Sequence, residues 1–170
     1  RQLAGFAHDP AVQKVMTDAL ATEAHATRWL VFDAMAGASI KKIPPDWTTA
    51  VQKELEGKDE AVVRAALDAA YALGRAAKSK VFNTALLKLA NNPKRPAGLR
   101  LKAVAAVTSL PAPLDAEVFS FLQNQITPDQ PAMQRAAAAT QLARAKLSDP
   151  QQLALIKNIP TVGPLELMHL

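Results

Sequence analysis

Eight lysine and arginine residues lie between Asp68 and Asp115 with no acidic residue among them. They are Arg75, Lys78, Lys80, Lys88, Lys94, Arg95, Arg100 and Lys102. A group of cations of this kind can bind phosphate, a nucleic acid or an acidic protein surface. Aromatic residues that could stack on bases are not interleaved with them, and several follow predicted helix ends. The pattern therefore favours a solvated rim, with nucleic-acid binding as the alternative.

Other residues capable of catalysis or metal binding are dispersed. The histidines His8, His25 and His169 have no second histidine or carboxylate at a metal-ligand spacing such as HExxH. Cysteine is absent, which excludes disulfides, thiolate catalysis and cysteine-ligated metals in this sequence. Residues 39–42 match S-x-x-K, but the companion S-D-N and K-T-G elements are missing. We therefore predict no catalytic, cofactor-binding or metal-binding residue.

The composition is that of a globular, helix-rich protein. Hydrophobic residues make up 49% of the chain and charged residues 21%, whereas aromatic residues are only 5%. The abundant alanine suits closely packed helices, and β-branched and aromatic residues are too few for extensive sheets. The net charge of +5 permits an acidic partner without requiring one. No apolar run approaches the roughly 18 residues of a membrane span.

Apolar residues recur at spacings of three and four through most of the chain, and proline-rich turns separate the periodic stretches. No alternating stretch is long enough to predict a strand. Asp9 and Asp46 are predicted N-caps, the helix after Gly57 has an acidic opening at Asp59, and Gly57 and Gly74 are predicted helix ends. The predicted helices cover about 10–22, 23–38, 46–57, 59–74, 80–91, 96–110, 114–125, 130–147 and 148–158, with a last one from about 163.

A repeat of about 36 residues organises these helices. Its recurring arginines are Arg28, Arg64, Arg100 and Arg135, at spacings of 36, 36 and 35, and we expect them to bond neighbouring carboxylates or helix ends. Positions one before, three after and seven after the arginine share one helical face, so we predict that this face is buried. The column three after the arginine holds Val31, Leu67, Ala103 and Ala138, and the column seven after it holds Met35, Tyr71, Val107 and Leu142. The column six after it, expected to permit close approach, holds Ala34, Ala70, Ala106 and Gln141.

The helix predicted over 59–74 resembles the second helix of HEAT repeats. The matching residues are Asp59, Val63 and Arg64, Ala66, Ala70, Leu73 and Gly74. The copies at Arg100 and Arg135 match more loosely, because they open on Pro96 and Pro131, and the Arg28 copy matches least. This resemblance implies an all-α fold: a right-handed α–α superhelix, or HEAT/armadillo-like solenoid, of about five antiparallel helix pairs. We expect residues 1–170 to form a single domain of this kind.

The order of DPAVQ, DEAVVRAALDA, PAGLRLKAVAAV, DPQQL and GPLEL resembles the helical-repeat segment of large exported bacterial proteins. In that family a β-propeller resembling sugar dehydrogenases precedes the repeats, and a haem-binding cytochrome c-like module follows them. The resemblance implies a non-catalytic protein-interaction or spacer module within a periplasmic or surface-attached redox protein. The initial arginine and the apolar end over 165–170 also lead us to expect a piece of a longer protein. The family's haem-attachment motif CxxCH is absent here.

Helical-repeat DNA glycosylases provide an enzymatic alternative, because they also combine HEAT-like repeats with basic grooves. Such an enzyme would need aromatic and acidic residues gathered on its concave face. Only Trp29, Trp47 and Asp33 could contribute here, together with the basic stretch 75–102. Tryptophans contribute strongly to protein cores, so we expect both to pack between the first and second repeats.

Overall fold

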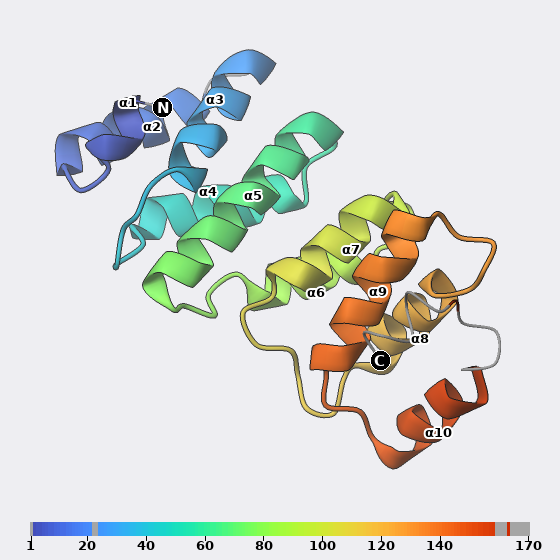
Figure 1. The fold of residues 1–170 in the computed structure, drawn as a ribbon. Helices are drawn as coiled ribbons and strands as arrows, with labels where there is room; N and C mark the ends of the chain where they lie inside the picture. The colour runs from blue at the N-terminus through green and yellow to red at the C-terminus, as the bar shows by residue number, and fades with distance from the viewer. Residues whose placement is uncertain (1, 22–23, 159–162, 164–170) are drawn as a thin grey trace. The chain divides into compact units, whose positions relative to one another are not determined.

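The computed structural model describes residues 2–21, 24–158 and 163. Throughout these residues the regular structure is α-helical and no β-strand occurs, which confirms the all-α prediction (Figure 1). None of the described helices is long and apolar enough to cross a membrane. The helices are α1 Gln2–Gly5, α2 Pro10–Leu20, α3 His25–Ala36, α4 Pro45–Leu55, α5 Glu60–Ala77, α6 Asn83–Asn91, α7 Ala97–Ala106, α8 Ala116–Gln125, α9 Ala132–Arg144 and α10 Asp149–Asn158.

Aspartate caps begin several helices, and the sequence predicts the one at Asp9. The Asp9 carboxylate accepts a hydrogen bond from the Ala11 amide at 2.7 Å at the start of α2. Asp59 and Asp115 each accept hydrogen bonds from two amides in the first turns of α5 and α8. Asp46 was wrongly predicted as a cap, because α4 already begins at Pro45 and Asp46 lies in its first turn. Proline is well suited to a first helical position, where no amide donor is needed.

The helix α5 continues through Gly74, so the predicted end at this glycine is wrong. The helix ends at Ala77, and Lys78 follows in the left-handed conformation with a φ of 49°. Gly74 is buried, and a Cβ at this position would lie 3.3 Å from the Thr108 hydroxyl oxygen. The glycine therefore permits a close approach instead of terminating the helix. The last predicted helix, beyond Gly163, lies outside the described residues.

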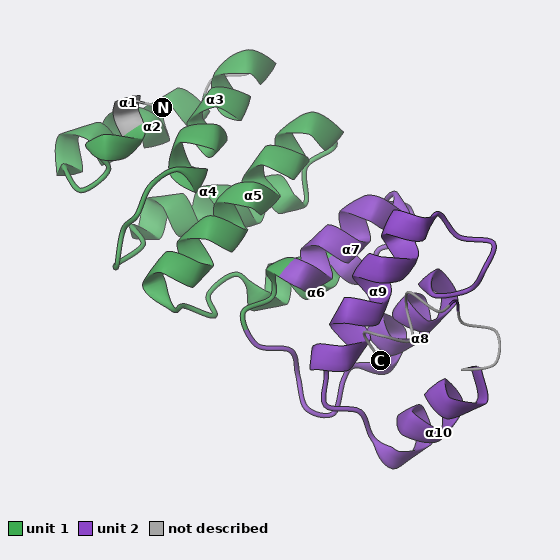
Figure 2. Ribbon diagram, viewed as in Figure 1, with its two compact units in different colours: residues 1–89, 106–108 green, residues 90–105, 109–170 purple. Residues whose placement is uncertain are grey.

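The chain divides into two compact units (Figure 2). Unit 1 contains residues 1–89 and 106–108, and unit 2 contains residues 90–105 and 109–170. The division falls within α6 and close to the end of α7. In unit 1, α2 packs on α3 and α4 packs on α5. The helix α2 also packs on α4, and α3 packs extensively on α5, so corresponding helices of two successive pairs lie side by side.

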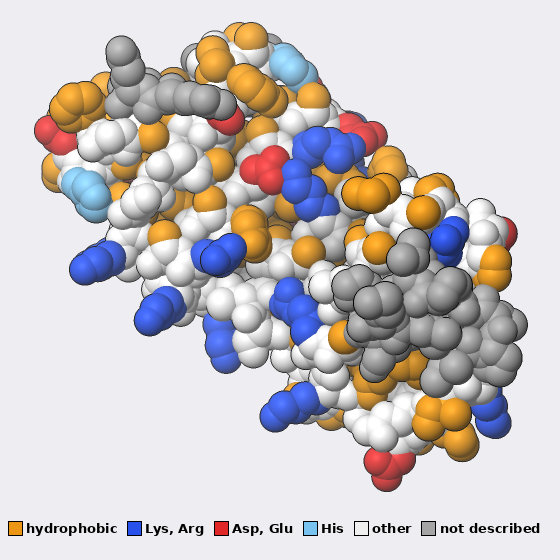
Figure 3. Space-filling model, in the orientation of Figure 1, with side chains coloured by type: hydrophobic (Ala, Val, Ile, Leu, Met, Phe, Trp, Pro, Cys, Tyr) orange, Lys and Arg blue, Asp and Glu red, His pale blue; other side chains and the backbone are white. Residues whose placement is uncertain are grey.

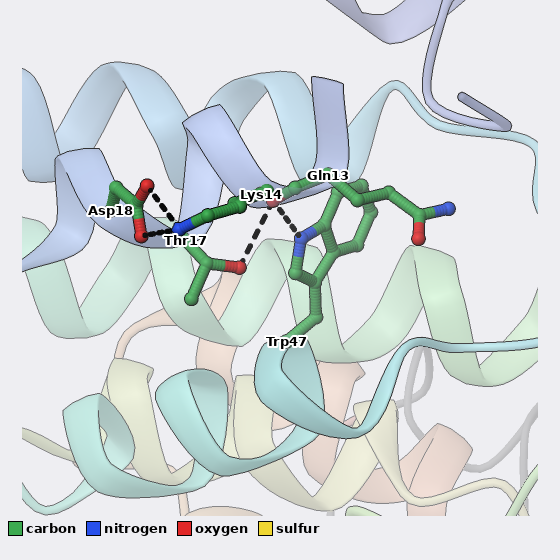
Figure 4. A network of polar contacts seen from close by, with 5 residues as sticks. All are labelled: Gln13, Lys14, Thr17, Asp18 and Trp47. Atoms are coloured by element: carbon green, nitrogen blue, oxygen red, sulfur yellow. Dashed lines mark hydrogen bonds and ion pairs between the residues drawn. The ribbon is translucent and has the colours of Figure 1, made fainter. Parts of the chain in front are cut away.

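The unit 1 core is formed by large apolar side chains from these helices. Trp47, Phe32 and Met35 are almost completely buried within it. The indole Nε1 of Trp47 donates to the Gln13 carbonyl at 3.4 Å, which connects α4 to α2 (Figure 4). The same carbonyl accepts a hydrogen bond from the Thr17 hydroxyl at 3.0 Å. Trp47 thus combines a buried ring with a satisfied polar group, as large buried aromatic side chains generally require.

In unit 2, α8 packs on α9 around a core that includes Leu99, Leu122 and Ala138. The loop before α8 is attached to the loop before α10, because the Leu114 amide donates to the Lys146 carbonyl at 2.9 Å. The Gln151 side-chain amide donates in turn to the Leu114 carbonyl at 2.8 Å. These hydrogen bonds attach α10 through backbone and amide groups, and none of its residues is fully buried.

Most residues in the repeat columns are buried in the structure, and Tyr71 is the clear exception. All members of the columns three and six after the arginines are buried, including Gln141 among the alanines. Val63 and Leu99, one position before the arginines, are fully buried, and Thr27 and Gln134 are partly buried. In the column seven after the arginines, Tyr71 is 40% exposed although its counterparts are buried. The 36-residue period therefore corresponds to a real buried face at most positions.

Candidate functional site

Two of the repeat arginines pair with carboxylates in unit 1. Arg64 donates through Nη2 to Glu60 Oε1 at 2.8 Å, one helical turn earlier in α5. Arg28 reaches from α3 to α4, where its Nη1 lies 3.9 Å from Glu54 Oε2. The Arg28 Nε is buried and has no hydrogen-bond partner. Equivalent arginines thus make a solvent-exposed pair in one case and a partly buried interhelical pair in the other.

The other two repeat arginines donate to backbone carbonyls in unit 2. Arg100 donates through Nε to the Ala90 carbonyl at 2.6 Å, at the end of α6. Its guanidinium carbon lies 3.7 Å from the centre of the Phe121 ring in α8. Arg135 donates through Nη1 to the Gln130 carbonyl at 2.8 Å, in the loop before α9. The sequence prediction that these arginines bond carboxylates or helix ends is therefore confirmed for Arg28, Arg64 and Arg100.

The eight basic residues of the stretch 75–102 divide equally between the units. Arg75, Lys78, Lys80 and Lys88 belong to unit 1, and Lys94, Arg95, Arg100 and Lys102 belong to unit 2. Lys88 is paired with Glu56 at 2.7 Å, and Arg75 donates to the Tyr71 hydroxyl at 2.7 Å. On the face drawn in Figure 3, lysine and arginine side chains lie in separate groups with uncharged and apolar surface between them. Neither unit by itself gathers all eight cations.

A histidine–aspartate contact links two helix starts in unit 1. His25 at the beginning of α3 contacts Asp59, which caps α5, through its Nδ1. The hydrogen bond from His25 is the main reason that the pKa of Asp59 is lowered, and the cap amides act in the same direction. His8 is exposed, and His169 lies outside the described residues. Within the described chain, no cluster of three histidine, aspartate or glutamate side chains could hold a metal ion.

The three residues considered for a glycosylase-like site do not form a common site, because Trp47 is buried whereas Trp29 and Asp33 are exposed on α3. Trp47 is completely buried, which confirms the packing expected for it. Trp29 is 42% exposed, so the same expectation was wrong for this residue. It directly follows Arg28 and consequently lies away from the buried face of α3. Asp33, one turn after Trp29, is exposed at a shallow depression near Gly37.

A depression of about 330 Å³ in unit 1 lies between α2, α3 and α4. Its wall contains two cations, Arg28 and Lys53, and two carboxylates, Asp46 and Glu54. Burial raises the pKa of Glu54, and the charge of Arg28 opposes this increase. The two positive and two negative charges in this depression therefore largely balance one another. The ion pair between Arg28 and Glu54 joins α3 to α4 within the depression.

A larger depression, of about 640 Å³, lies in unit 2 between α8 and the segment that connects α6 to α7. Arg100 and Phe121 line it, and polar side chains from α8 complete the wall. Burial lowers the pKa of Arg100, but an arginine remains charged at neutral pH because its ordinary pKa is far above neutrality. The depression therefore contains a fixed cation stacked on an aromatic ring.

Two carboxamides in this depression have oxygens without hydrogen-bond partners. They are the Asn91 Oδ1 and the Gln125 Oε1, and both atoms are buried. The Asn91 nitrogen donates to the Asp115 carboxylate at 3.4 Å, which directs the amide oxygen elsewhere. Gln125 is only 9% exposed. An unpaired buried carbonyl costs about 1–3 kcal/mol, so a ligand that donates to these oxygens would gain binding energy.

Sequence reasoning identified Arg100 in this depression but missed Asn91, Phe121 and Gln125. A signal was present in α8, where Glu117, Phe121 and Gln125 recur every four residues and therefore lie on one helical face. A polar and aromatic stripe of this kind is compatible with either a binding site or an ordinary surface. Asn91 and Arg100 line the same depression as this stripe, which favours a binding site over an ordinary surface. Their position beside the stripe depends on how α8 packs.

Comparison of the chain with protein-family models, with curated proteins and with solved structures found no significant match.

Proposed function

We propose that this chain is a non-catalytic helical-repeat scaffold that serves as a protein-interaction or spacer module. In this proposal its architecture is a HEAT-like, right-handed α–α solenoid, and it belongs to a larger, exported redox protein. The observation that supports this most directly is the packing in unit 1, where α3 lies on α5 and α2 lies on α4. Helix pairs that stack through equivalent helices are the structural unit of solenoid proteins.

The repeat columns support the same proposal. Val31 and Leu67 occupy the same position in α3 and α5, and both are buried. Ala34 and Ala70 are buried in the column of small residues, which allows neighbouring helices to approach closely. A repeat of this kind buries its apolar face only against its neighbours, so the array leaves an extended outer surface for binding.

Crosslinking mass spectrometry on the parent protein, together with the sequence flanking residues 1 and 170, tests this proposal. With a lysine-reactive reagent we expect crosslinks from exposed side chains such as Lys80 and Lys94 to a flanking domain or a second protein. We also expect a propeller-type domain before the chain and a CxxCH motif after it. Flanking regions without these features would contradict the redox context, and the absence of such crosslinks would contradict the interaction role.

Nucleic-acid binding is the second candidate, and the acid-free stretch between Asp68 and Asp115 is the observation that favours it. Exposed Lys78, Lys80 and Lys94 would provide the phosphate contacts. This alternative predicts retention on a DNA or heparin column at low salt, with affinity falling steeply as salt increases. Elution without retention at low salt would exclude it, whereas the protein-interaction proposal would be unaffected.

A further inference from the structure

We propose that the depression between α8 and the α6–α7 segment binds an extended acidic peptide segment. A carboxylate of the peptide would pair with Arg100, and main-chain N–H groups would donate to the amide oxygens of Asn91 and Gln125. This binding mode rests on the proposed function, because it assigns a site and a chemical class to the protein partner.

Arg100 is held in position for a carboxylate. Its Nε bond to the Ala90 carbonyl and its stacking on Phe121 fix the plane of the guanidinium group. Neither contact uses the two terminal nitrogens, and no described residue accepts a hydrogen bond from them. The free edge of a guanidinium matches a carboxylate in a bidentate arrangement, which a lysine could not reproduce.

The unpartnered carboxamide oxygens define the second requirement, because they need hydrogen-bond donors. A peptide backbone supplies N–H donors, whereas the phosphates of a nucleic acid offer only acceptors at neutral pH. Asn91 and Gln125 both line the depression, but their oxygens are buried, so each carboxamide must rotate about its broad terminal torsion to present its oxygen to a ligand. The acceptors therefore favour a peptide over a phosphate-rich partner.

The size and lining of the depression suit a short extended segment. Its volume of about 640 Å³ is within the range of small ligand sites, and residues of α8 form most of its wall. An extended peptide presents alternate N–H groups along one edge and places alternate side chains on opposite faces. Glu117, exposed on the same helix, would repel a second acidic group and so restrict the peptide carboxylate to Arg100.

The first test compares two capped peptides with the isotopically labelled full chain by nuclear magnetic resonance. The probes are Ac-Ala-Ala-Glu-Ala-Ala-NH₂ and the same peptide with glutamine in place of glutamate. We expect amide shift changes concentrated in residues 90–100 and α8, with roughly tenfold tighter binding of the glutamate peptide, the ratio that one charge-assisted hydrogen bond can provide. Equal binding of the two peptides, or shift changes only elsewhere, would overturn the proposal.

Variants separate the carboxylate contact from the amide contacts. Arg100→Lys keeps the charge and should remove most of the preference for glutamate, whereas Gln125→Leu should weaken both peptides about equally. Arg64→Ala changes the equivalent repeat arginine in unit 1 and should alter neither affinity. Amide spectra that match the unchanged chain establish that each variant is folded. If Arg100→Lys leaves the preference intact in a folded chain, the proposed carboxylate contact is wrong.

Two further probes test whether the negatively charged group that binds in the depression belongs to a peptide or to a phosphate. Inorganic phosphate and a single-stranded oligothymidylate lack the pattern of N–H donors, so we expect neither to displace the glutamate peptide at equal concentration. Tighter binding of the oligonucleotide in this depression would overturn the peptide assignment. Crosslinks from the parent protein to a partner at another surface would leave the proposed function intact while refuting this site.

Discussion

Arg64 in unit 1 and Arg100 in unit 2 occupy the same position of the repeat but have different environments. Arg64 pairs with Glu60, the residue four positions earlier, and remains exposed. At the corresponding position before Arg100 the sequence has Pro96, which offers no carboxylate. The Arg100 guanidinium instead packs against Phe121 and donates to the backbone. A repeat position thus determines where a side chain leaves its helix, while neighbouring residues determine what it contacts.

The largest expected difference between the units concerns the column seven after the arginines. Leu142 in unit 2 is 2% exposed, whereas Tyr71 in unit 1 is 40% exposed. Leu142→Ala should lower the free energy of unfolding by about 3 kcal/mol, because it leaves a cavity in a packed core. Tyr71→Ala should cost less than about 1 kcal/mol. Urea denaturation followed by circular dichroism measures both values, and similar losses would show that burial does not distinguish these positions.

The equivalent repeat arginines Arg100 and Arg64 should differ in their effect on the free energy of unfolding, but by less than Leu142 and Tyr71. Arg100→Ala removes a charge-assisted hydrogen bond and a cation–π contact, so we expect a loss of about 2 kcal/mol in the free energy of unfolding. Arg64→Ala removes an exposed ion pair within one helix and should change stability by no more than about 0.5 kcal/mol. Arg100→Met is the control, because it retains an apolar contact with Phe121 without the hydrogen bond. Equal effects of the two alanine variants in denaturation would contradict the comparison.

Two helical glycines should respond in opposite directions. A Cβ added at Gly98 in α7 would meet no atom within 4 Å, so Gly98→Ala should stabilise the chain by about 0.5 kcal/mol. At Gly74 the new Cβ would crowd the Thr108 hydroxyl, which is held by the Ser79 carbonyl at 3.0 Å. Gly74→Ala should therefore lower the melting temperature. In a Thr108→Ala background the same change should raise it, and failure of this reversal would show that Thr108 is not the obstacle.

The smallest expected effects are those of pH, and two carboxylates of unit 1 act in opposite directions. The pKa of Asp59 is lowered from 3.8, so its stabilising contribution is complete above that value and is lost as the pH falls through the lower folded-state pKa. The pKa of Glu54 is raised from 4.5, so its ionisation opposes folding above this range and that cost disappears on acidification.

Melting temperatures measured between pH 7 and pH 3 can separate these two contributions. Asp59→Asn should reduce the loss of stability at the acidic end, and His25→Ala should reduce it in part, because His25 is the main cause of the lowered Asp59 pKa. Glu54→Gln should have the opposite effect on the slope, since the relief on acidification disappears with the carboxylate. Parallel profiles for all three variants and the unchanged chain would contradict both assignments.

Local patterns were sufficient to predict helices at the positions of α2 to α10 and most of the buried face, whereas the short α1 was not predicted. Asp59 marks the start of α5 because a short carboxylate can accept from free amides at the beginning of a helix, and this depends only on adjacent residues. Leu67 was predicted buried from spacing alone, because residues three and four apart share a helical face, and Ala70 was expected to allow close approach because of its small size. The end of α5 was mispredicted at Gly74, since the same glycine signal can indicate a helix end or a close contact.

The sequence by itself determined that this protein is helical, approximately where most of its helices lie, and most of the buried face of each repeat, because these properties follow from residues close together in the chain. Only the tertiary structure decided that Gly74 meets Thr108 and that Arg100 stacks on Phe121 beside the unpaired oxygens of Asn91 and Gln125. Those contacts join residues on different helices. Their geometry depends on how the helices pack, and a 36-residue period does not specify which side chains will meet.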